Sequence, residues 1–445
     1  MFLLHKSWLA VAMAVAALLM VVNSGLAFAQ ATSGSISGTV LDPSGAVVPN
    51  ATVEIHNPVS GLDRSTKTDS KGNFSFPNVP YNPYHLEVTA EGFAKQAEDA
   101  EVRSVVPVNL NISLHVIGST EAVTVEAQSE DLLENDSTFH TDVDRDLFDK
   151  LPLESASSSV SSLVTLATPG IAADSNGLFH GMGDHAENSF SVDGQPITDQ
   201  QSKVFSNQIP MDSIASMEVI AGAPPAQYGD KTSVVIDVTT RSGQGMTTPK
   251  GELNTSYGSF GTSTLDFNLG YGGKNWGNFI SLSGLNTGRF LDPPEFRVVH
   301  AKGNEENVFD RVDYGFSKSD SIHLNLGFTR SWFQNPNSYD NQLHLGETDP
   351  SGNPLPPTDQ RSQIKTFNIA PVWTHILNNN TVYTLGGFVR RDNYNYYPSG
   401  NPFADLSPIQ QETVQQNRKL LNAGARTDLS YVKGIHNLKI GAMYE

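Results

Sequence analysis

The sequence predicts a mainly β protein in three parts, and three observations support this fold class. Between residues 34 and 116, short segments of alternating apolar and polar residues are separated by turn sequences, as in a small β-sandwich. From Lys250 onward the alternating segments lengthen to about ten residues, which is typical of membrane-spanning β-strands. After residue 29 no apolar segment is long enough to cross a bilayer as a helix.

Composition excludes several functional classes. The 445-residue chain has no cysteine, which excludes disulfides, thiolate metal sites and cysteine nucleophiles. Its formal net charge of -19 argues against nucleic-acid binding, because neutralising phosphates requires a basic surface. A hydrophobic content of 38% excludes a helical membrane protein but not a β-barrel, whose strands are only half apolar.

The N-terminal segment has the features of a secretory signal peptide. Lys6 supplies a positive charge, residues 8–22 are apolar, and residues 27–29 (Ala-Phe-Ala) form a small-x-small cleavage sequence. We expect cleavage between Ala29 and Gln30, with a retained anchor as the alternative.

The first globular segment reads as a β-sandwich. This segment resembles the carboxypeptidase regulatory-like domain, a prealbumin-like sandwich with a carbohydrate-binding-like fold. The resemblance rests on SGTVLDPSGAVVPNATV and, after it, on Thr68, Asp69, Phe74 and Phe76. We expect a structural spacer, with ligand binding as the alternative, since fold does not establish function. The expected strands lie in SISGTVLD, ATVEIHN, GNFSFPNV, HLEVTAEGF and VPVNLNISLHV.

Residues 189–243 contain three more predicted strands in an informative order. SFSV ends at Asp193-Gly194, a pair that favours a hairpin turn because both residues tolerate positive φ. IASMEVIAG follows and stops at Pro224, and VVIDVTT is the third strand.

This order resembles the plug domain of TonB-dependent outer-membrane transporters. The sequence departs from the family pattern at Ala221, where the family usually has arginine, and at Ser233-Val234, where it usually has a glycine pair. The matching residues are Val192, Asp193, Gly194, Ile214, Met217, Glu218, Val219, Gly222, Pro224, Tyr228, Gly229 and residues 235–241.

The segment before the plug resembles a TonB box, which pairs with the periplasmic C-terminal domain of TonB by strand addition. Its β-branched residues favour an extended state, and a linker strand or a last strand of the sandwich is the alternative. The candidate residues are Glu121, Ala122, Val123, Thr124 and Val125.

Two further features of the plug region carry expectations. Short helices are predicted over residues 144–150 and 157–167. His180, Asp184, His185 and Glu187 form a tight cluster that could bind a divalent ion, but no regular spacing places the four on one face. We expect a solvated loop and no metal.

The C-terminal half has the alternation of barrel strands, with a soluble antiparallel sheet as the alternative. The row Ile322, Leu324, Leu326 and Phe328 is expected to face lipid. Long polar connections over residues 291–304 and 335–360 suit the extracellular side. We count eight or nine strands, whereas the resemblance implies twenty-two, so the sheet is expected to be an incomplete barrel.

The resemblance as a whole is to Oar-like TonB-dependent receptors. It implies an outer-membrane protein of a Gram-negative cell, not an enzyme, without cofactor or catalytic residues, that takes up an extracellular ligand such as a carbohydrate or an oligomeric nutrient. TonB and outer-membrane lipid are the implied partners. A non-transporting surface or adhesion protein and a truncated receptor fragment are the alternatives. The expected domains are a signal peptide (1–29), the regulatory-like sandwich (30–117), a TonB-box-like linker (118–128), the plug (129–245) and the N-terminal part of the barrel (246–445).

We predict that the exported protein begins at Gln30, because residues 27–29 form the one good cleavage sequence after the apolar run. N-terminal sequencing of the protein from the cell envelope tests this. Recovery of Met1 would contradict it.

Overall fold

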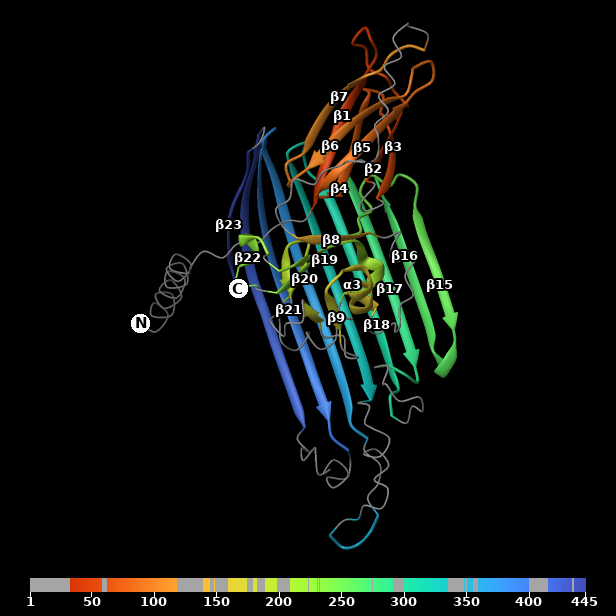
Figure 1. Ribbon diagram of the computed structural model, residues 1–445, viewed down its shortest axis with the longest axis vertical. Coiled ribbons are helices and arrows are strands. Elements are labelled where there is room, and N and C mark those ends of the chain that lie inside the picture. Colours follow the sequence, from red (N-terminus) through yellow and green to blue (C-terminus); the bar gives the residue numbers. More distant parts are fainter. Residues whose placement is uncertain are drawn as a thin grey trace, which may run out of the picture.

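The chain folds into a small sandwich, a central domain and one large sheet (Figure 1). The central domain lies against one face of the large sheet, and the sandwich stands at one end of its strands. This computed structural model describes residues 33–57, 62–117, 139–144, 148, 159–173, 179–181, 189–197, 209–222, 224–229, 231, 233–273, 275–290, 300–334, 348, 350–354, 359–399, 415–433 and 436–445.

The sandwich packs a three-stranded sheet on a four-stranded sheet. The first sheet has the order β4-β1-β7 and the second the order β3-β2-β5-β6. Inward residues such as Ile36, Val53 and Phe76 form its core. The strands are β1 (Ser33–Leu41), β2 (Thr52–His56), β3 (Asp63–Lys67), β4 (Asn73–Pro80), β5 (Asn82–Thr89), β6 (Gln96–Val102) and β7 (Val108–Ser113).

The expected sandwich is confirmed, but two of its strands were not predicted. β3 and β6 are the two edges of the four-stranded sheet, and their sequences, DRSTK and QAEDAEV, are mostly polar. An edge strand is open to solvent, so it needs little of the apolar alternation that marks a strand in a sequence.

The central domain has a five-stranded sheet in the order β12-β11-β14-β13-β8, backed by one helix. The three strands predicted around Asp193-Gly194 are β11, β13 and β14, and the helix expected over residues 157–167 is α3. The helix expected from Asp144 is wrong at its start, because Asp144 ends β8 in pairing with β13. The elements are β8 (His140–Asp144), α3 (Ser159–Ala167), β9 (Ile171–Ala173), β10 (Phe179–Gly181), β11 (Ser189–Val192), β12 (Gln195–Ile197), η3 (Met211–Ser213), β13 (Ile214–Ala221), η4 (Ala226–Tyr228) and β14 (Val234–Thr240).

Helices contribute little to this chain. In the part that the structure describes, no helix is both long enough and apolar enough to cross a membrane.

The large sheet is a nine-stranded antiparallel meander in which each strand pairs with the next. It does not close, because β15 and β23 are its edges. Nine strands agree with the expected eight or nine. They are β15 (Lys250–Tyr257), β16 (Ser263–Gly272), β17 (Trp276–Thr287), β18 (Gly303–Gly315), β19 (Asp320–Gln334), β20 (Arg361–Asn378), β21 (Thr381–Tyr397), β22 (Gln416–Lys433) and β23 (His436–Tyr444), with η5 (Ser259–Gly261) between β15 and β16.

The two faces of the large sheet differ in polarity. Asn325 of β19 points to the central domain and contacts it. Since side chains alternate along a strand, the row from Ile322 to Phe328 at even positions points away, and Phe328 is 42% exposed. This confirms the predicted outward orientation of that row.

Candidate functional site

A tight turn carries the charged group through which the central domain meets the large sheet. Asp193 and Gly194 join β11 to β12, and both adopt positive φ angles, 47° and 77°. This is the backbone of the two-residue hairpin predicted from the sequence. The turn leaves the Asp193 side chain only 6% exposed, so its negative charge needs partners within the protein.

Four donors surround the Asp193 carboxylate. The Thr240 backbone N–H donates to Oδ1 at 3.0 Å, and the Thr240 hydroxyl donates to Oδ2 at 2.6 Å. From the large sheet, Asn325 Nδ2 donates to Oδ2 at 2.5 Å and Arg311 Nη1 lies 3.4 Å from it. Burial alone would raise the pKa of Asp193, but the Arg311 guanidinium and the hydrogen bonds from Thr240 hold it below its ordinary value.

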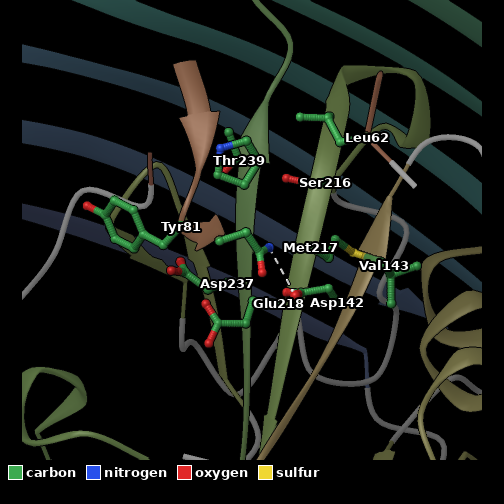
Figure 2. Close-up of a pocket in the computed structure, with 11 residues that line it drawn as sticks. Leu62, Tyr81, Asp142, Val143, Ser216, Met217, Glu218, Asp237 and Thr239 are labelled. Atoms are coloured by element: carbon green, nitrogen blue, oxygen red, sulfur yellow. Dashed lines mark hydrogen bonds between the residues drawn. The ribbon is translucent and has the colours of Figure 1, made fainter. Parts of the chain in front are cut away.

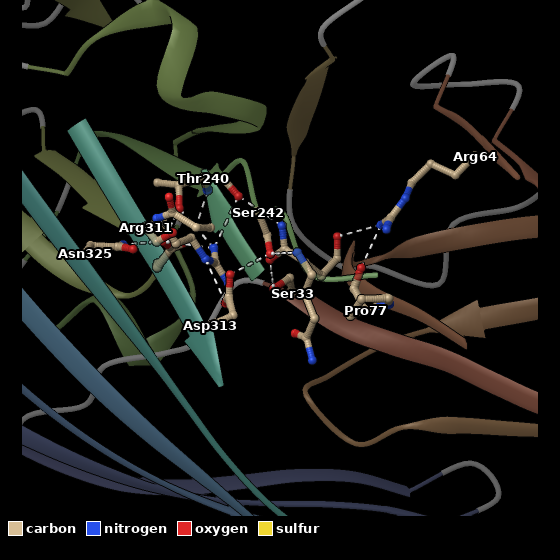
Figure 3. Close-up of polar contacts among 12 residues, drawn as sticks. Ser33, Arg64, Pro77, Thr240, Ser242, Arg311, Asp313 and Asn325 are labelled. Atoms are coloured by element: carbon tan, nitrogen blue, oxygen red, sulfur yellow. Dashed lines mark hydrogen bonds and ion pairs between the residues drawn. The ribbon is translucent and has the colours of Figure 1, made fainter. Parts of the chain in front are cut away.

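Arg311 links this turn to a second carboxylate. Its Nε and Nη2 both donate to Asp313 Oδ1 at 3.0 Å, and its Nη1 donates to the Thr240 hydroxyl at 2.9 Å. Ser242 closes the group by donating to Asp313 Oδ2 at 2.6 Å. Figure 3 shows Arg311 lying between Thr240 and Asp313. One buried cation thus compensates two buried acids across the domain boundary.

Two more contacts fix the turn to the sheet. Arg426 Nη2 donates to the Asp193 carbonyl oxygen at 2.6 Å. Gln195 and Asn368 exchange amide hydrogen bonds at 2.7 and 2.9 Å. The central domain therefore supplies the acid and the sheet supplies the cations, whereas Ala221, at the position of the usual family arginine, has no charge to contribute.

The sandwich reaches the same turn through Asn78. Its Nδ2 donates to the Thr240 carbonyl oxygen at 2.9 Å, while its Oδ1 accepts from the Ser33 hydroxyl at 2.9 Å. Arg64 Nη1 donates to the backbone oxygens of Pro77 and Asn78 at 2.7 and 3.1 Å. Figure 3 places Arg64 and Pro77 on the sandwich side of this chain of contacts. Thr240 is thus shared by all three parts of the molecule.

A small cavity lies between the sandwich and the central domain (Figure 2). Three acids on adjacent strands line it, because Glu218 pairs in register with both Asp142 and Asp237. Its volume of about 20 Å³ suits one water molecule and excludes a nutrient ligand. Within the described ranges, no group of three or more His, Asp or Glu side chains could hold a metal ion.

Among the three acids that line the cavity, Asp237 has an incomplete set of hydrogen bonds. It is 4% exposed, and the Tyr228 hydroxyl donates to its Oδ2 at 3.0 Å. Its Oδ1 has no hydrogen-bond partner among the described residues. Burial raises the pKa of Asp237 to about 7. The hydrogen bonds from Ser191 and Tyr228 lower this pKa, but their effect is smaller than that of burial. Burial likewise raises the pKa of Tyr228 well above its ordinary value.

The other plug-motif residues shape the backbone. Val192 ends β11, and Glu218 and Val219 lie on β13. Gly222 and Gly229 adopt φ angles of 105° and 60°, which favour glycine. Pro224 lies just before η4 (Ala226–Tyr228).

Sequence reasoning included Thr240 in the matching segment 235–241 but missed Arg311, Asn325 and Arg426, which complete the site. A signal for two of them exists, because Arg-x-Asp occurs at 311–313, 390–392 and 426–428, always at inward-facing positions. In the second pair, Arg390 Nε and Nη2 donate to Asp392 at 2.8 and 3.0 Å.

Three groups of predicted residues lie outside the described residues. They are the cleavage site at Ala29 and Gln30, the TonB-box candidate at 121–125, and Asp184, His185 and Glu187 of the acidic and histidine cluster.

Comparison with known proteins agrees with these domains. The family model of the carboxypeptidase regulatory-like domain matches residues 35–115, and that of the TonB-dependent receptor plug domain matches residues 135–234. The TonB-dependent transporter Oar of Myxococcus xanthus is 27% identical over 238 residues, which cover 50% of this chain and 22% of Oar.

The similar solved structures share the fold at low sequence identity. The ferric-catecholate import receptor Fiu of E. coli K12 in its open form is 14% identical, with a TM-score of 0.51 over 69% of this chain and 49% of Fiu. The siderophore receptor PiuA of Acinetobacter baumannii is 12% identical, with a TM-score of 0.50 over 69% of this chain and 45% of PiuA. The chain thus spans less than half the length of these receptors.

We predict that Asp193→Asn loosens the turn from the sheet, because it removes the charge that Arg311 and Thr240 stabilise while asparagine still tolerates positive φ. The docking should weaken by roughly 1–3 kcal/mol. The chain has no native cysteine, so the maleimide labelling rate of an Ile197→Cys reporter measures the opening. Asp63→Asn, which removes an exposed carboxylate, is the control; equal rates in both variants would contradict the prediction.

We predict that Asp237 makes the stability of the central domain fall as the pH rises. Its folded pKa of about 7 lies above the unfolded value of about 3.9, so its contribution is complete below about pH 4 and is lost as the pH passes about 7. Asp237→Asn mimics the neutral carboxyl and should flatten this dependence. Hydrogen exchange of the β14 amides across this pH range measures it, and parallel profiles for both proteins would rule it out.

Proposed function

The chain has the regulatory-like and plug domains of an Oar-like TonB-dependent receptor, and we propose that it takes up a ligand across the outer membrane by TonB-driven movement of its plug. One observation carries this proposal. Among the described residues, the core of the plug is formed by its own residues, from Val143 to Val238, while its hydrogen bonds to the sheet centre on Asp193. A domain with its own core can move as a unit when such contacts are exchanged for water.

The proposed path of force runs through the N-terminal side of the plug. TonB pairs with residues 121–125 by strand addition, and β8 (His140–Asp144) is the first described strand that follows this segment in the sequence. In the described part of the plug sheet, β8 is an edge strand and pairs with β13. Tension on the segment therefore pulls first on an edge strand, which holds fewer hydrogen bonds than a central strand.

The Asp193 turn is the contact that must yield for the plug to move. It is held by charge-assisted hydrogen bonds in a buried setting, which are costly to break one at a time. Water entering along the parted surface can replace each of these bonds, whereas it could not replace an apolar contact. The contact suits a plug that stays closed at rest and opens under force.

The ligand is proposed to bind on the extracellular side, at the long connections of the sheet. A carbohydrate or an oligomeric nutrient is the class that we favour, because the resemblance to Oar-like receptors implies an extracellular ligand of this kind. Fiu is a ferric-catecholate import receptor and PiuA is a siderophore receptor, so ferric siderophores are the second class to screen. The cavity next to Asp237 is too small for either class.

We predict that Val123→Pro abolishes binding of the periplasmic C-terminal domain of TonB, because proline removes a backbone donor from the added strand. Titration of that domain against the purified receptor measures the affinity. Gln128→Pro, in the same linker but beyond the candidate segment, is the matched control and should bind normally. Unchanged binding by Val123→Pro would show that residues 121–125 form only a linker.

A further inference from the structure

On four adjacent strands, the outward apolar row is followed by a basic residue at the same end of the sheet. Outward positions are those that alternate with residues reaching the plug, such as Asn325, Asn368 and Arg426. On each of β19, β20, β21 and β22, the next outward residue beyond the apolar row is a lysine or an arginine. These pairs are Phe328 and Arg330, Phe367 and Lys365, Val389 and Arg391, and Leu421 and Lys419.

Strand register brings these four cations into one band, which we call the basic belt (Arg330, Lys365, Arg391 and Lys419). Arg330 lies directly opposite Lys365, and both Lys365 and Lys419 lie opposite Asn393. Like charges on adjacent strands repel each other. An anionic counterpart would therefore stabilise a belt of this kind.

The described residues supply little of that counterpart. Glu306 of β18 pairs with Arg330 at 2.9 Å. Lys365, Arg391 and Lys419 are exposed, and no hydrogen bond or ion pair joins their side chains to any described residue. This is notable in a chain with a net charge of -19, where acids are plentiful elsewhere.

The belt lies at the end of the strands remote from the sandwich (Figure 1). Lys419 is near the start of β22, whereas the turn from β22 to β23 approaches the sandwich, where Asn437 Nδ2 donates to the Arg103 carbonyl oxygen. At that other end of β19 and β20, the outward residues are Asp320 and His375, which pair with each other at 2.7 Å. The positive charge is therefore confined to one end.

We propose that the basic belt binds the phosphate-bearing headgroups of membrane lipids, in the leaflet at the end remote from the sandwich. A molecule bound to the belt also lies beside the apolar row that includes Phe328, Phe367, Val389 and Leu421. An amphiphile with an anionic head and apolar tails matches both features, whereas a free phosphate matches only the first. Lysine and arginine suit this position because their stems follow apolar surface while the charged ends reach the headgroups.

The proposal rests on the membrane placement in the proposed function, and spin-labelled lipids test it directly. The protein purified from the membrane that contains it is returned to phosphatidylcholine bilayers. The association of spin-labelled phosphatidylglycerol is then compared with that of spin-labelled phosphatidylcholine. We expect a preference for phosphatidylglycerol that falls in the variant Lys365→Gln/Arg391→Gln/Lys419→Gln, by up to about fivefold for each cation removed.

A matched variant, Lys67→Gln/Lys71→Gln/Lys318→Gln, removes three exposed lysines of the sandwich and the opposite end, and should keep the preference. Equal losses in both variants, or no preference in the inserted wild-type protein, would overturn the proposal. If soluble glycerol phosphate abolished the preference for phosphatidylglycerol, the belt would be a site for free phosphate. That result would also overturn the proposal.

Failure of the proposed function would give a different experimental result from failure of the lipid-binding proposal alone. A protein that enters no bilayer overturns the membrane placement and this proposal with it. TonB-domain binding by the belt variant, measured in parallel, shows whether the rest of the receptor is intact.

Discussion

The buried carboxylate of Asp193 is the constraint on which the arrangement of the three domains depends. A charge at this depth is tolerated only when donors surround it, and these donors come from separate parts of the chain. Thr240 supplies two hydrogen bonds from the plug itself, and Arg311 and Asn325 approach from the large sheet. The sandwich joins through Asn78, whose amide donates to the Thr240 carbonyl oxygen. Displacement of any one part would leave a buried polar group without a partner.

The polar site at Asp193 contrasts with the separate apolar cores of the sandwich and the plug. Among the described residues, the sandwich and the plug each have a hydrophobic core of their own residues. The contacts between them are hydrogen bonds and ion pairs that water can replace. Under the proposed function, each domain would keep its core while these contacts are exchanged for water.

The strands of the large sheet serve two environments at once. Their inward residues include the Arg-x-Asp pairs, such as Arg390 with Asp392, which satisfy each other within one strand. Their outward residues form apolar rows that end on the basic belt. Because side chains alternate along a strand, a single sequence can carry a charge-compensated inner surface and an apolar outer surface without conflict.

The sequence by itself determined the secondary structure of the interior strands and the backbone of the key turn. Alternation over 322–328 and the Asp193-Gly194 pair are local signals, since each depends on neighbouring residues alone. The edge strands β3 and β6 escaped because a solvated edge needs no apolar row. The partners of Asp193 were decided only by the tertiary structure: Arg311 and Asn325 lie 118 and 132 residues further along the chain. Their pairing arises from strand register across a sheet, and register, unlike a turn, is a property of strands that are distant in the sequence.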